Sequence, residues 1–343
     1  MNQTQVIGTH NSYHQRTHPS LMKLIAASKP EAVSELDYGH RPLHEQLDMG
    51  VRQLELDCYA DPDGGRFAHP MGPKQAEASG LPPVPSNDPE GELLKPGIKV
   101  MHIPDIDYGT SVLTLLDGLK EIRAWSVAHP RHAPIFLLIE LKSETLGPSF
   151  TQALPWDADQ LAALDREILS VFPRQEIITP DEVRGSYQSL PEALQQRGWP
   201  LLDKARGKVL FGMDNEGDER QAYLRGHPAL ENRVLFVSVP RANPAAAWMK
   251  INDPIKDFAR IQEMVRAGFL VRTRADEPTG QARNDDTRMR DKALASGAQY
   301  VSTDYPEPDL KLSVYSVQLE EKHAARTNPV NGPFSLRGID LDP

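Results

Sequence analysis

Three carboxylates interrupt apolar segments of the sequence, where an unpaired negative charge would be costly. Glu55 and Asp57 are two residues apart in VRQLELDCY, so both side chains point to the same side of a strand. Glu140 stands inside the apolar segment IFLLIELK. Three buried carboxylates repel one another unless a cation neutralises them. The sequence therefore predicts a positive charge beside this group.

That positive charge could come from a basic side chain or from a metal ion. For each carboxylate taken alone, an ion pair with a neighbour such as Arg52 or Lys142 is the simpler interpretation. The whole group favours a metal, because Asn11 in GTHNSYH adds an amide oxygen from another predicted strand. Hard oxygen donors select Ca²⁺ or Mg²⁺, and an irregular, carboxylate-rich set suits Ca²⁺ better. The expected Ca²⁺ ligands are Asn11, Glu55, Asp57 and Glu140.

Two histidines at predicted strand ends supply groups that can transfer protons beside such an ion. His10 ends the first strand, and His102 ends the third, in VMHIPDI. Imidazole changes charge near neutral pH, so this pair suggests general acid and general base catalysis. The histidines without a comparable setting are His14, His18, His69 and His129. Among these, His69 would replace His102 if the third strand lies elsewhere.

The elements that position these side chains follow the alternation typical of an α/β protein. Eight short apolar or β-branched segments are predicted as strands, with helical periodicity between them. They cover residues 5–8, 51–58, 99–103, 135–142, 208–213, 233–239, 268–273 and 299–303. Such alternation implies parallel pairing, and eight units favour a single closed (β/α)8 barrel of the TIM type, with its catalytic residues at the C-terminal ends of the strands.

We expect one catalytic barrel domain over residues 1–343, with three additions. Residues 14–38 carry LMKLIAA, which either packs on the barrel rim or dips into a bilayer. Residues 59–97 contain eight prolines and are predicted as a long loop without regular structure. Both insertions follow strands and so belong to the catalytic face. Residues 307–343 form a C-terminal extension.

Composition limits the partners of the protein. The net charge is −10 and no block of like charges stands out, which argues against nucleic acid. The single cysteine, Cys58, cannot form an internal disulfide, and no apolar segment is long enough to span a membrane. A strand predicted almost from Met1 leaves no room for a signal peptide. We expect a monomer that is secreted or periplasmic in its mature form, with a cytoplasmic location as the alternative.

Six segments, taken in order, resemble the bacterial calcium-dependent phosphatidylinositol-specific phospholipase C family, whose barrel is related to eukaryotic phosphoinositide phospholipases C. They are GTHNSYH, QLELDCY, VMHIPDIDY, LLIELK, RTRAD and YVSTDYP. The resemblance implies that His10 and His102 are the catalytic pair. It also implies Ca²⁺ at Asn11, Glu55, Asp57 and Glu140.

The resemblance implies cleavage of phosphatidylinositol, at a membrane surface, to diacylglycerol and inositol 1,2-cyclic phosphate. The neighbouring ring hydroxyl would attack phosphorus, an intramolecular geometry with effective molarities of about 10⁵–10⁸ M. Ca²⁺ would hold a phosphate oxygen and this hydroxyl, and Glu55 or Glu140 would accept the proton. We expect His10 to donate a hydrogen bond to the phosphoryl oxygen and His102 to protonate the glycerol oxygen.

Substrate contacts are predicted on later strands. The candidate residues are Lys142, Arg272, Arg274 and Tyr305. The two arginines face one side of their strand and either bind the anionic substrate or pair with Asp276 or the site carboxylates. Tyr305 either contacts the inositol ring or forms part of a lid. Eukaryotic members carry lysines for ring phosphates on the strand resembling KVLFGMD, where this sequence has Gly212 and Asp214. We therefore expect a preference for unphosphorylated phosphatidylinositol.

Two alternatives remain open. A glycerophosphodiester phosphodiesterase shares the barrel, paired histidines and a Glu-x-Asp site, but usually has His-Arg-Gly where this chain has His-Asn-Ser; sphingomyelinase-like enzymes are a more distant version. A non-catalytic barrel that binds calcium and lipid headgroups would have no need of His10 and His102.

Overall fold

Eight parallel strands close into a barrel in the computed structural model, which describes residues 1–277 and 279–342. The barrel strands are β1 (Thr4–Thr9), β2 (Gln53–Tyr59), β4 (Ile135–Leu141), β5 (Val209–Met213), β6 (Leu235–Ser238), β7 (Ala246–Lys250), β8 (Leu270–Arg274) and β9 (Tyr300–Thr303). β1 pairs with β9 on one side and with β2 on the other, which closes the ring. The predicted (β/α)8 barrel is therefore confirmed.

One predicted barrel strand is wrong. Residues 99–103 contain only the two-residue β3 (Lys99–Val100), which pairs antiparallel with the end of β2 and lies outside the ring. The missing member of the ring is β7, with the sequence AAWMK. It escaped prediction because residues 239–245, all of them described, contain no helix between β6 and β7, and because alanine is a weak strand former.

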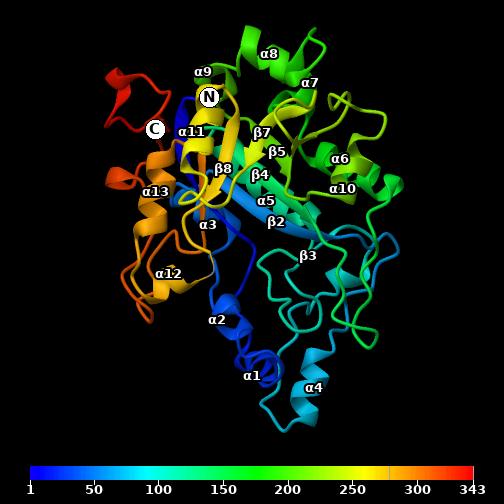
Figure 1. Ribbon diagram of the computed structural model, residues 1–343. Helices are drawn as coiled ribbons and strands as arrows, with labels where there is room; N and C mark the ends of the chain where they lie inside the picture. The colour runs from blue at the N-terminus through cyan, green and yellow to red at the C-terminus, as the bar shows by residue number, and fades with distance from the viewer. Residues whose placement is uncertain (278, 343) are drawn as a thin grey trace.

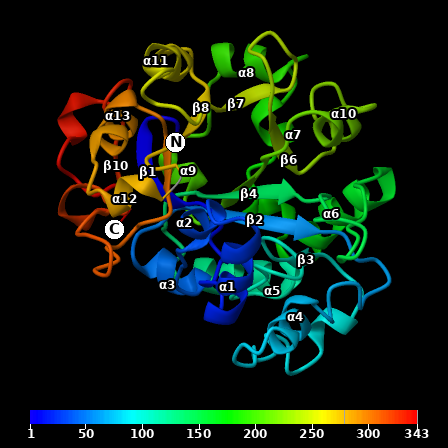
Figure 2. The ribbon, with the colours of Figure 1, turned by 60° about the horizontal axis from the view of Figure 1, so that its bottom comes forward.

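Helices surround the barrel and fill the insertions (Figures 1 and 2). The α-helices are α1 (Pro19–Ser28), α2 (Ala32–Leu36), α3 (Leu43–Asp48), α4 (Gly72–Ala78), α5 (Leu115–Ala128), α6 (Ala158–Val171), α7 (Pro180–Arg184), α8 (Leu190–Gln196), α9 (Leu202–Ala205), α10 (Asp218–Leu224), α11 (Phe258–Arg266), α12 (Gly280–Arg283) and α13 (Arg288–Ser296). Short 3₁₀ turns cover Glu92–Leu94, Arg174–Glu176, Glu320–Lys322 and Phe334–Leu336. α6 begins with a capping box in which Asp157 and Gln160 bond to each other's backbone N–H groups.

The two insertions project from the end of the barrel where the parallel strands finish, which we call the barrel mouth. In Figure 1, α1, α2 and α4 lie below the barrel, while both termini lie near its upper end. The prediction that residues 59–97 lack regular structure is wrong, because this segment contains α4 and a 3₁₀ turn. α4 approaches α1 closely at Gly72, where a Cβ would lie 2.7 Å from Cδ2 of Leu21 and 2.2 Å from the oxygen of Asp105. The close packing therefore depends on glycine.

The apolar segment LMKLIAA lies in α1 and turns its large side chains inward. Leu21 is 3% exposed and packs with Phe67, Leu93 and Met101 in an apolar cluster under the insertions. This burial favours the packing alternative over insertion into a bilayer.

Leu21→Ser should therefore lower the free energy of unfolding by about 2–5 kcal/mol, because it removes buried methyl groups and buries a hydroxyl. Denaturant unfolding measures the loss. Ala26→Ser, an exposed position on the same helix, is the matched control and should change stability by less than about 0.5 kcal/mol. Unchanged stability of Leu21→Ser, with weaker binding to lipid vesicles, would favour the bilayer interpretation instead.

The C-terminal residues complete the outside of the barrel. β10 (Ala325–Thr327) pairs antiparallel with β1, and Asp342 forms an ion pair with Arg52. Arg52 also donates to the carbonyl of Leu47 at 2.7 Å. One interpretation of the sequence paired Arg52 with a site carboxylate. Its contacts with Asp342 and Leu47 show that it has other partners.

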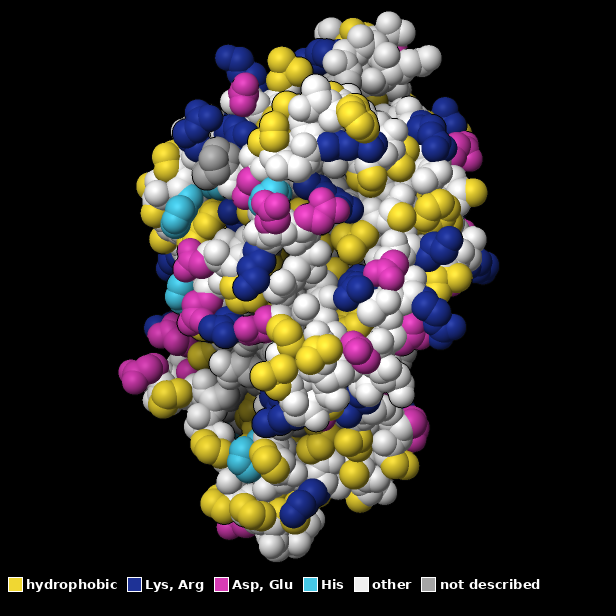
Figure 3. All heavy atoms as spheres, turned by 90° about the vertical axis from the view of Figure 1, so that its left-hand side faces the viewer, with side chains coloured by type: hydrophobic (Ala, Val, Ile, Leu, Met, Phe, Trp, Pro, Cys, Tyr) yellow, Lys and Arg dark blue, Asp and Glu magenta, His cyan; other side chains and the backbone are white. Residues whose placement is uncertain are grey.

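The surface carries mixed charge on the face shown in Figure 3, where acidic and basic side chains are interspersed. Hydrophobic side chains gather toward its lower end, the end at which α1 and α4 lie in Figure 1. Among the described residues, no helix combines the length and apolar character that crossing a membrane requires.

Candidate active site

The three predicted carboxylates meet at the barrel mouth. Asp57 of β2 is directly opposite Glu140 of β4 in the parallel ladder, and Glu55 lies one pleat earlier on β2. One oxygen from each of the three lies within 4.8 Å of the others. Glu55 points across the barrel, since its Oε2 accepts a hydrogen bond from Arg272 of β8 at 2.7 Å. The alternation of side chains along β2 thus delivers both acids to the interior, as predicted.

Asn11 follows the end of β1, next to the residue that contacts β2. The amide of Ser12, its neighbour, donates to the carbonyl of Glu55 at 2.9 Å, which fixes the turn beside β2. Asn11 has a φ of 45°, in the left-handed region that asparagine tolerates better than most residues. Its Nδ2 donates to the hydroxyl of Tyr38 at 2.9 Å, so its Oδ1 is the atom left for a ligand.

The oxygens of this group fit a hard cation. Asn11 Oδ1 and both carboxylate oxygens of Asp57 are buried and have no hydrogen-bond partner among the described residues. Two basic groups approach the cluster: Lys142 Nζ lies 3.0 Å from Glu140 Oε1 and 3.6 Å from Asp57 Oδ2, and Arg272 binds Glu55. When all three carboxylates are ionised, they exceed these two cations by one negative charge. The donor set therefore suits Ca²⁺. The predicted ion pair between Lys142 and a site carboxylate is also present, with Glu140 as its partner.

Burial and mutual repulsion raise the pKa values of two of the clustered carboxyl groups when no cation is bound. Burial raises the pKa of Glu55 to about 7, although the positive charge of Arg272 opposes this shift. Burial and the neighbouring Glu140 raise the pKa of Asp57 well above its usual range, against the effect of Lys142. Both carboxyls therefore hold protons more tightly than in the unfolded chain.

This ionisation predicts a pH-dependent stabilisation by Ca²⁺. The pKa of Glu55 rises from its ordinary 4.5 to about 7 in the fold, so its contribution to stability is present below pH 4.5 and is lost as the pH rises through about 7. A bound dication favours the ionised carboxylates and reverses the loss. We expect Ca²⁺ to raise the melting temperature more at about pH 8 than at about pH 5. Sodium chloride at matched ionic strength is the control, and an equal shift at both pH values would contradict the assignment.

His10 stands at the barrel mouth with a carboxylate behind it. Its Nδ1 lies 2.8 Å from Asp304 Oδ1, and its Nε2 lies 3.7 Å from Glu55 Oε1. Burial, with a further effect of the positive charge of Arg274, lowers the pKa of His10 to about 3, so the ring is neutral near pH 7. With Nδ1–H donated to Asp304, Nε2 of the neutral ring is an acceptor.

Asp304 was missed as the partner of His10. Strand pairing explains the contact, because Thr9 of β1 lies opposite Thr303 of β9, which places the following residues side by side. The signal was present in the sequence: His10 and Asp304 each come one residue after a strand, and the first and last strands of a closed barrel are neighbours.

His102 is also held by a carboxylate, but it does not end a barrel strand as predicted. It lies in the loop after β3, where its Nδ1 is 2.6 Å from Asp107 Oδ2. The same carboxylate lies 3.0 Å from Nε2 of the fully buried His14. Burial disfavours the charged form of His14, but the negative charge of Asp107 outweighs this and raises the pKa of His14.

The two predicted catalytic histidines share one end of the barrel. Their rings are linked through intermediate rings, with centroid distances of 6.2 Å from His10 to Tyr38, 4.6 Å from Tyr38 to His14 and 5.7 Å from His14 to His102. His69 is exposed in its loop and does not take the place of His102.

The predicted arginines are buried and already paired. Arg272 binds Glu55, and Arg274 Nη2 lies 3.1 Å from Asp304 Oδ2. These contacts correspond to the ion-pair alternative of the sequence analysis, so both arginines hold site carboxylates in place. Tyr305 is 3% exposed and packs against Tyr315, with ring centroids 6.0 Å apart, which favours its structural alternative.

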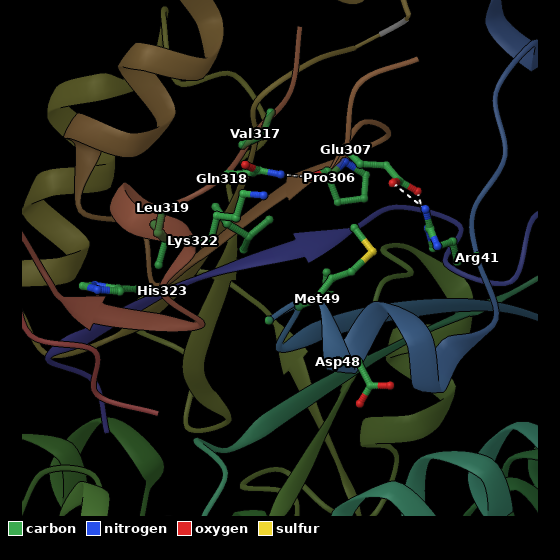
Figure 4. A pocket seen from close by; sticks show the side chains of 13 residues that line it. Arg41, Asp48, Met49, Pro306, Glu307, Val317, Gln318, Leu319, Lys322 and His323 are labelled. Atoms are coloured by element: carbon green, nitrogen blue, oxygen red, sulfur yellow. Dashed lines mark hydrogen bonds and ion pairs between the residues drawn. The ribbon is translucent and has the colours of Figure 1, made fainter. Parts of the chain in front are cut away.

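Two cavities differ in their relation to this site. One of about 350 Å³ is lined by His102, Lys142, Tyr59 and the apolar Leu146 and Phe150, so it borders the site directly. Another of about 440 Å³ lies on the outer side of the barrel and is lined by side chains such as Met49, Lys322 and His323 (Figure 4). None of the predicted site residues lines this second cavity.

Comparisons with known proteins agree with the geometry. Residues 1–329 match the family model described as phosphoinositide phospholipase C, Ca²⁺-dependent. No curated protein matches the sequence. The fold is similar to a solved Ca²⁺-dependent phosphatidylinositol-specific phospholipase C from Streptomyces antibioticus, with 17% identity, a TM-score of 0.54 and coverage of 88% of this chain and 94% of that chain.

A second similar fold is a calcium-dependent phosphoinositol-specific phospholipase C from the Gram-negative bacterium Pseudomonas sp. One of its crystal forms gives 16% identity and a TM-score of 0.56, and its myo-inositol complex gives 15% and 0.52. In both cases the match covers 95% of this chain and 94% of that chain. At these identities the structural likeness shows a shared fold, while the family model carries the relationship in sequence.

Proposed function

Since the chain belongs to the Ca²⁺-dependent phosphoinositide phospholipase C family, we propose that it cleaves phosphatidylinositol to diacylglycerol and inositol 1,2-cyclic phosphate. The observation that carries the proposal is the pairing of each histidine with its own aspartate beside the carboxylate cluster. His10 contacts Asp304 and His102 contacts Asp107. Two oriented imidazoles are what a reaction needs when one oxygen loses a proton and another gains one.

The oxygen cluster would hold the cation of the family. Its residues are Asn11, Glu55, Asp57 and Glu140. When bound, Ca²⁺ supplies positive charge near the phosphate, which stabilises the negative charge that builds up on the phosphoryl oxygens. Arg272 keeps Glu55 in position, and Lys142 does the same for Glu140.

His10 is assigned the role of general base, which revises the expectation that it donates a hydrogen bond to the phosphoryl oxygen. The contact with Asp304 uses Nδ1–H, so Nε2 of the neutral ring accepts the proton of the inositol 2-hydroxyl. The 2-oxygen then bonds to phosphorus. The imidazolium that forms lies beside Asp304, whose negative charge stabilises it. In this assignment Glu55 and Glu140 are not needed as the base.

His102 is assigned the role of general acid. Asp107 accepts its Nδ1–H, which leaves Nε2–H as the proton donor. As the bond between phosphorus and the glycerol oxygen breaks, that oxygen takes the proton from Nε2, and diacylglycerol leaves neutral. The cavity of about 350 Å³ beside His102 has apolar walls at Leu146 and Phe150, which suits a departing glyceride.

The test compares phosphatidylinositol vesicles with glycerophosphocholine, each with Ca²⁺ and with a chelator. We expect diacylglycerol from phosphatidylinositol only when Ca²⁺ is present, and no cleavage of glycerophosphocholine. Faster cleavage of glycerophosphocholine would favour the glycerophosphodiester phosphodiesterase alternative. Binding of Ca²⁺ without cleavage of either substrate would favour a non-catalytic barrel.

Unphosphorylated phosphatidylinositol should be the preferred substrate over phosphatidylinositol bisphosphate. The basic side chains at the barrel mouth are each committed to a carboxylate: Lys142 to Glu140, Lys250 to Asp214, Arg272 to Glu55 and Arg274 to Asp304. Extra ring phosphates would meet no uncommitted cation among these four. A Cβ at Gly212 would lie 2.5 Å from Cζ of Phe136, so that position faces the barrel core rather than the substrate.

This preference is measured by initial rates on two sets of vesicles, one containing phosphatidylinositol and the other phosphatidylinositol bisphosphate. We expect a higher kcat/KM for phosphatidylinositol, and a faster reaction with the bisphosphate would contradict the charge argument.

A further inference from the structure

His14, Asp107 and His102 form a compact nitrogen and oxygen cluster that is separate from the carboxylate group. Asp107 Oδ2 lies 2.6 Å from His102 Nδ1 and 3.0 Å from His14 Nε2. One ligand atom from each residue lies within 4.8 Å of the other two. Thr17 also donates to Asp107, so the carboxylate is fixed from a third direction.

The donor types of this cluster differ from those of the Ca²⁺ candidate. Two imidazole nitrogens and one carboxylate oxygen suit Zn²⁺ and Co²⁺, whereas the neighbouring cluster offers oxygen only and suits Ca²⁺. Ligands at tetrahedral positions about 2.0–2.1 Å from Zn²⁺ lie about 3.3 Å apart. The two measured contacts of 2.6 and 3.0 Å are shorter than this by about 0.7 and 0.3 Å, so shifts of less than 1 Å in the side chains make room for an ion.

An ion also has a way in and a free coordination position. His14 and Asp107 are fully buried, but the side chain of His102 is 19% exposed and lines the cavity of about 350 Å³ at the barrel mouth. Solvent in that cavity can provide the fourth ligand of a tetrahedral site.

We propose that His14, Asp107 and His102 form a second metal site, selective for Zn²⁺ or a similar ion, whose occupation inhibits the enzyme. Binding replaces the two N–H···O hydrogen bonds by metal–ligand bonds and releases protons from His14 Nε2 and His102 Nδ1. A ring coordinated through Nδ1 no longer becomes the imidazolium that the general acid requires. The inhibitory effect rests on the proposed function, but the binding of the ion does not.

Binding is tested first, with the full chain saturated with Ca²⁺ so that the oxygen cluster is filled. Calorimetric titration with Zn²⁺ should show one strong site per chain, and Co²⁺ should give the visible absorption of a tetrahedral complex. His14→Phe keeps the stacking on Tyr38 and removes a ligand, so it should weaken Zn²⁺ binding by more than about 100-fold. His14→Gln serves as a second variant, and Ca²⁺ binding by each variant verifies its fold.

Two controls locate the ion. His44→Gln changes an exposed histidine that pairs with Glu121 away from the site, and it should leave Zn²⁺ affinity unchanged. Asp57→Asn alters the oxygen cluster and should also retain the Zn²⁺ site. Zn²⁺ binding that is lost in Asp57→Asn but kept in both His14 variants would overturn the proposal, as would the absence of any strong site in the parent protein.

Inhibition is tested separately at saturating Ca²⁺. Zn²⁺ should abolish phosphatidylinositol cleavage by the parent protein, while the residual activity of His14→Phe should resist the same concentration. Zn²⁺ binding without inhibition of an active enzyme would overturn the inhibitory role. A protein that binds Zn²⁺ through His14 but never cleaves phosphatidylinositol would support the metal site while refuting the proposed function.

Discussion

His102→Ala should lower kcat for phosphatidylinositol by about 10²–10⁴-fold, and an activated leaving group should restore most of the loss. The reason is the assigned chemistry: the glycerol oxygen needs a proton as it leaves, whereas p-nitrophenolate is stable without one. The measurement compares phosphatidylinositol with p-nitrophenyl inositol phosphate for the parent protein and the variant. His10→Ala should lose a similar factor on both substrates, because the attacking hydroxyl is the same in each.

His44→Ala is the matched control, since this exposed histidine lies outside the site, and it should behave like the parent protein on both substrates. Equal losses for His102→Ala on the two substrates would remove its role as general acid. Rescue of His10→Ala by the better leaving group would exchange the two assignments. Retention of Ca²⁺ binding by both variants would verify that the site is otherwise intact.

Asp57→Asn should weaken Ca²⁺ binding by more than about 100-fold and reduce turnover accordingly. Both oxygens of Asp57 are buried and lack hydrogen-bond partners among the described residues, so both are available to coordinate an ion. The asparagine keeps the shape of the side chain but replaces one carboxylate oxygen by an NH₂ group. In the parent protein, Nζ of Lys142 lies 3.6 Å from Oδ2 of Asp57. Calorimetric titration with Ca²⁺ measures the change in affinity.

A second measurement distinguishes this result from misfolding. Without Ca²⁺, Asp57→Asn should melt at a higher temperature than the parent protein near neutral pH, because it removes one of three crowded acids. Asp286→Asn, which alters a partly exposed acid paired with Arg288, is the control and should leave Ca²⁺ affinity unchanged. Unaltered Ca²⁺ affinity in Asp57→Asn would place the ion elsewhere in the protein.

Local periodicity predicted most of the barrel and the carboxylate cluster. Glu55 and Asp57 share a face because side chains alternate along a strand, and Glu140 joins them because its strand is the next in the ring. The prediction missed β7, because the short segment between β6 and β7 lacks the helix that makes the other strand–helix units recognisable. Residues 99–103 took its place in the prediction because an apolar doublet in a loop has the same local pattern as a barrel strand.

The partners of the two histidines could not be predicted in the same way. Asp304 reaches His10 only because the barrel closes between its first and last strands, nearly 300 residues apart in the chain. Asp107 joins His14 and His102 through the folding of one loop onto another, which leaves no periodic signal. The position of Asp304 just after a strand is visible in the sequence, but its pairing with His10 depends on closure of the barrel, whereas the pairing of His14 with Asp107 depends on loop packing.

The most direct test of the account is phosphorus NMR of phosphatidylinositol vesicles incubated with the protein, once with Ca²⁺ and once with a chelator. Attack by the ring hydroxyl, with His10 as base and His102 as acid, predicts the signal of a five-membered cyclic phosphodiester as the first product, with Ca²⁺ and not with the chelator. An acyclic inositol phosphate as the first product, or equal turnover in the presence of the chelator, would contradict the account.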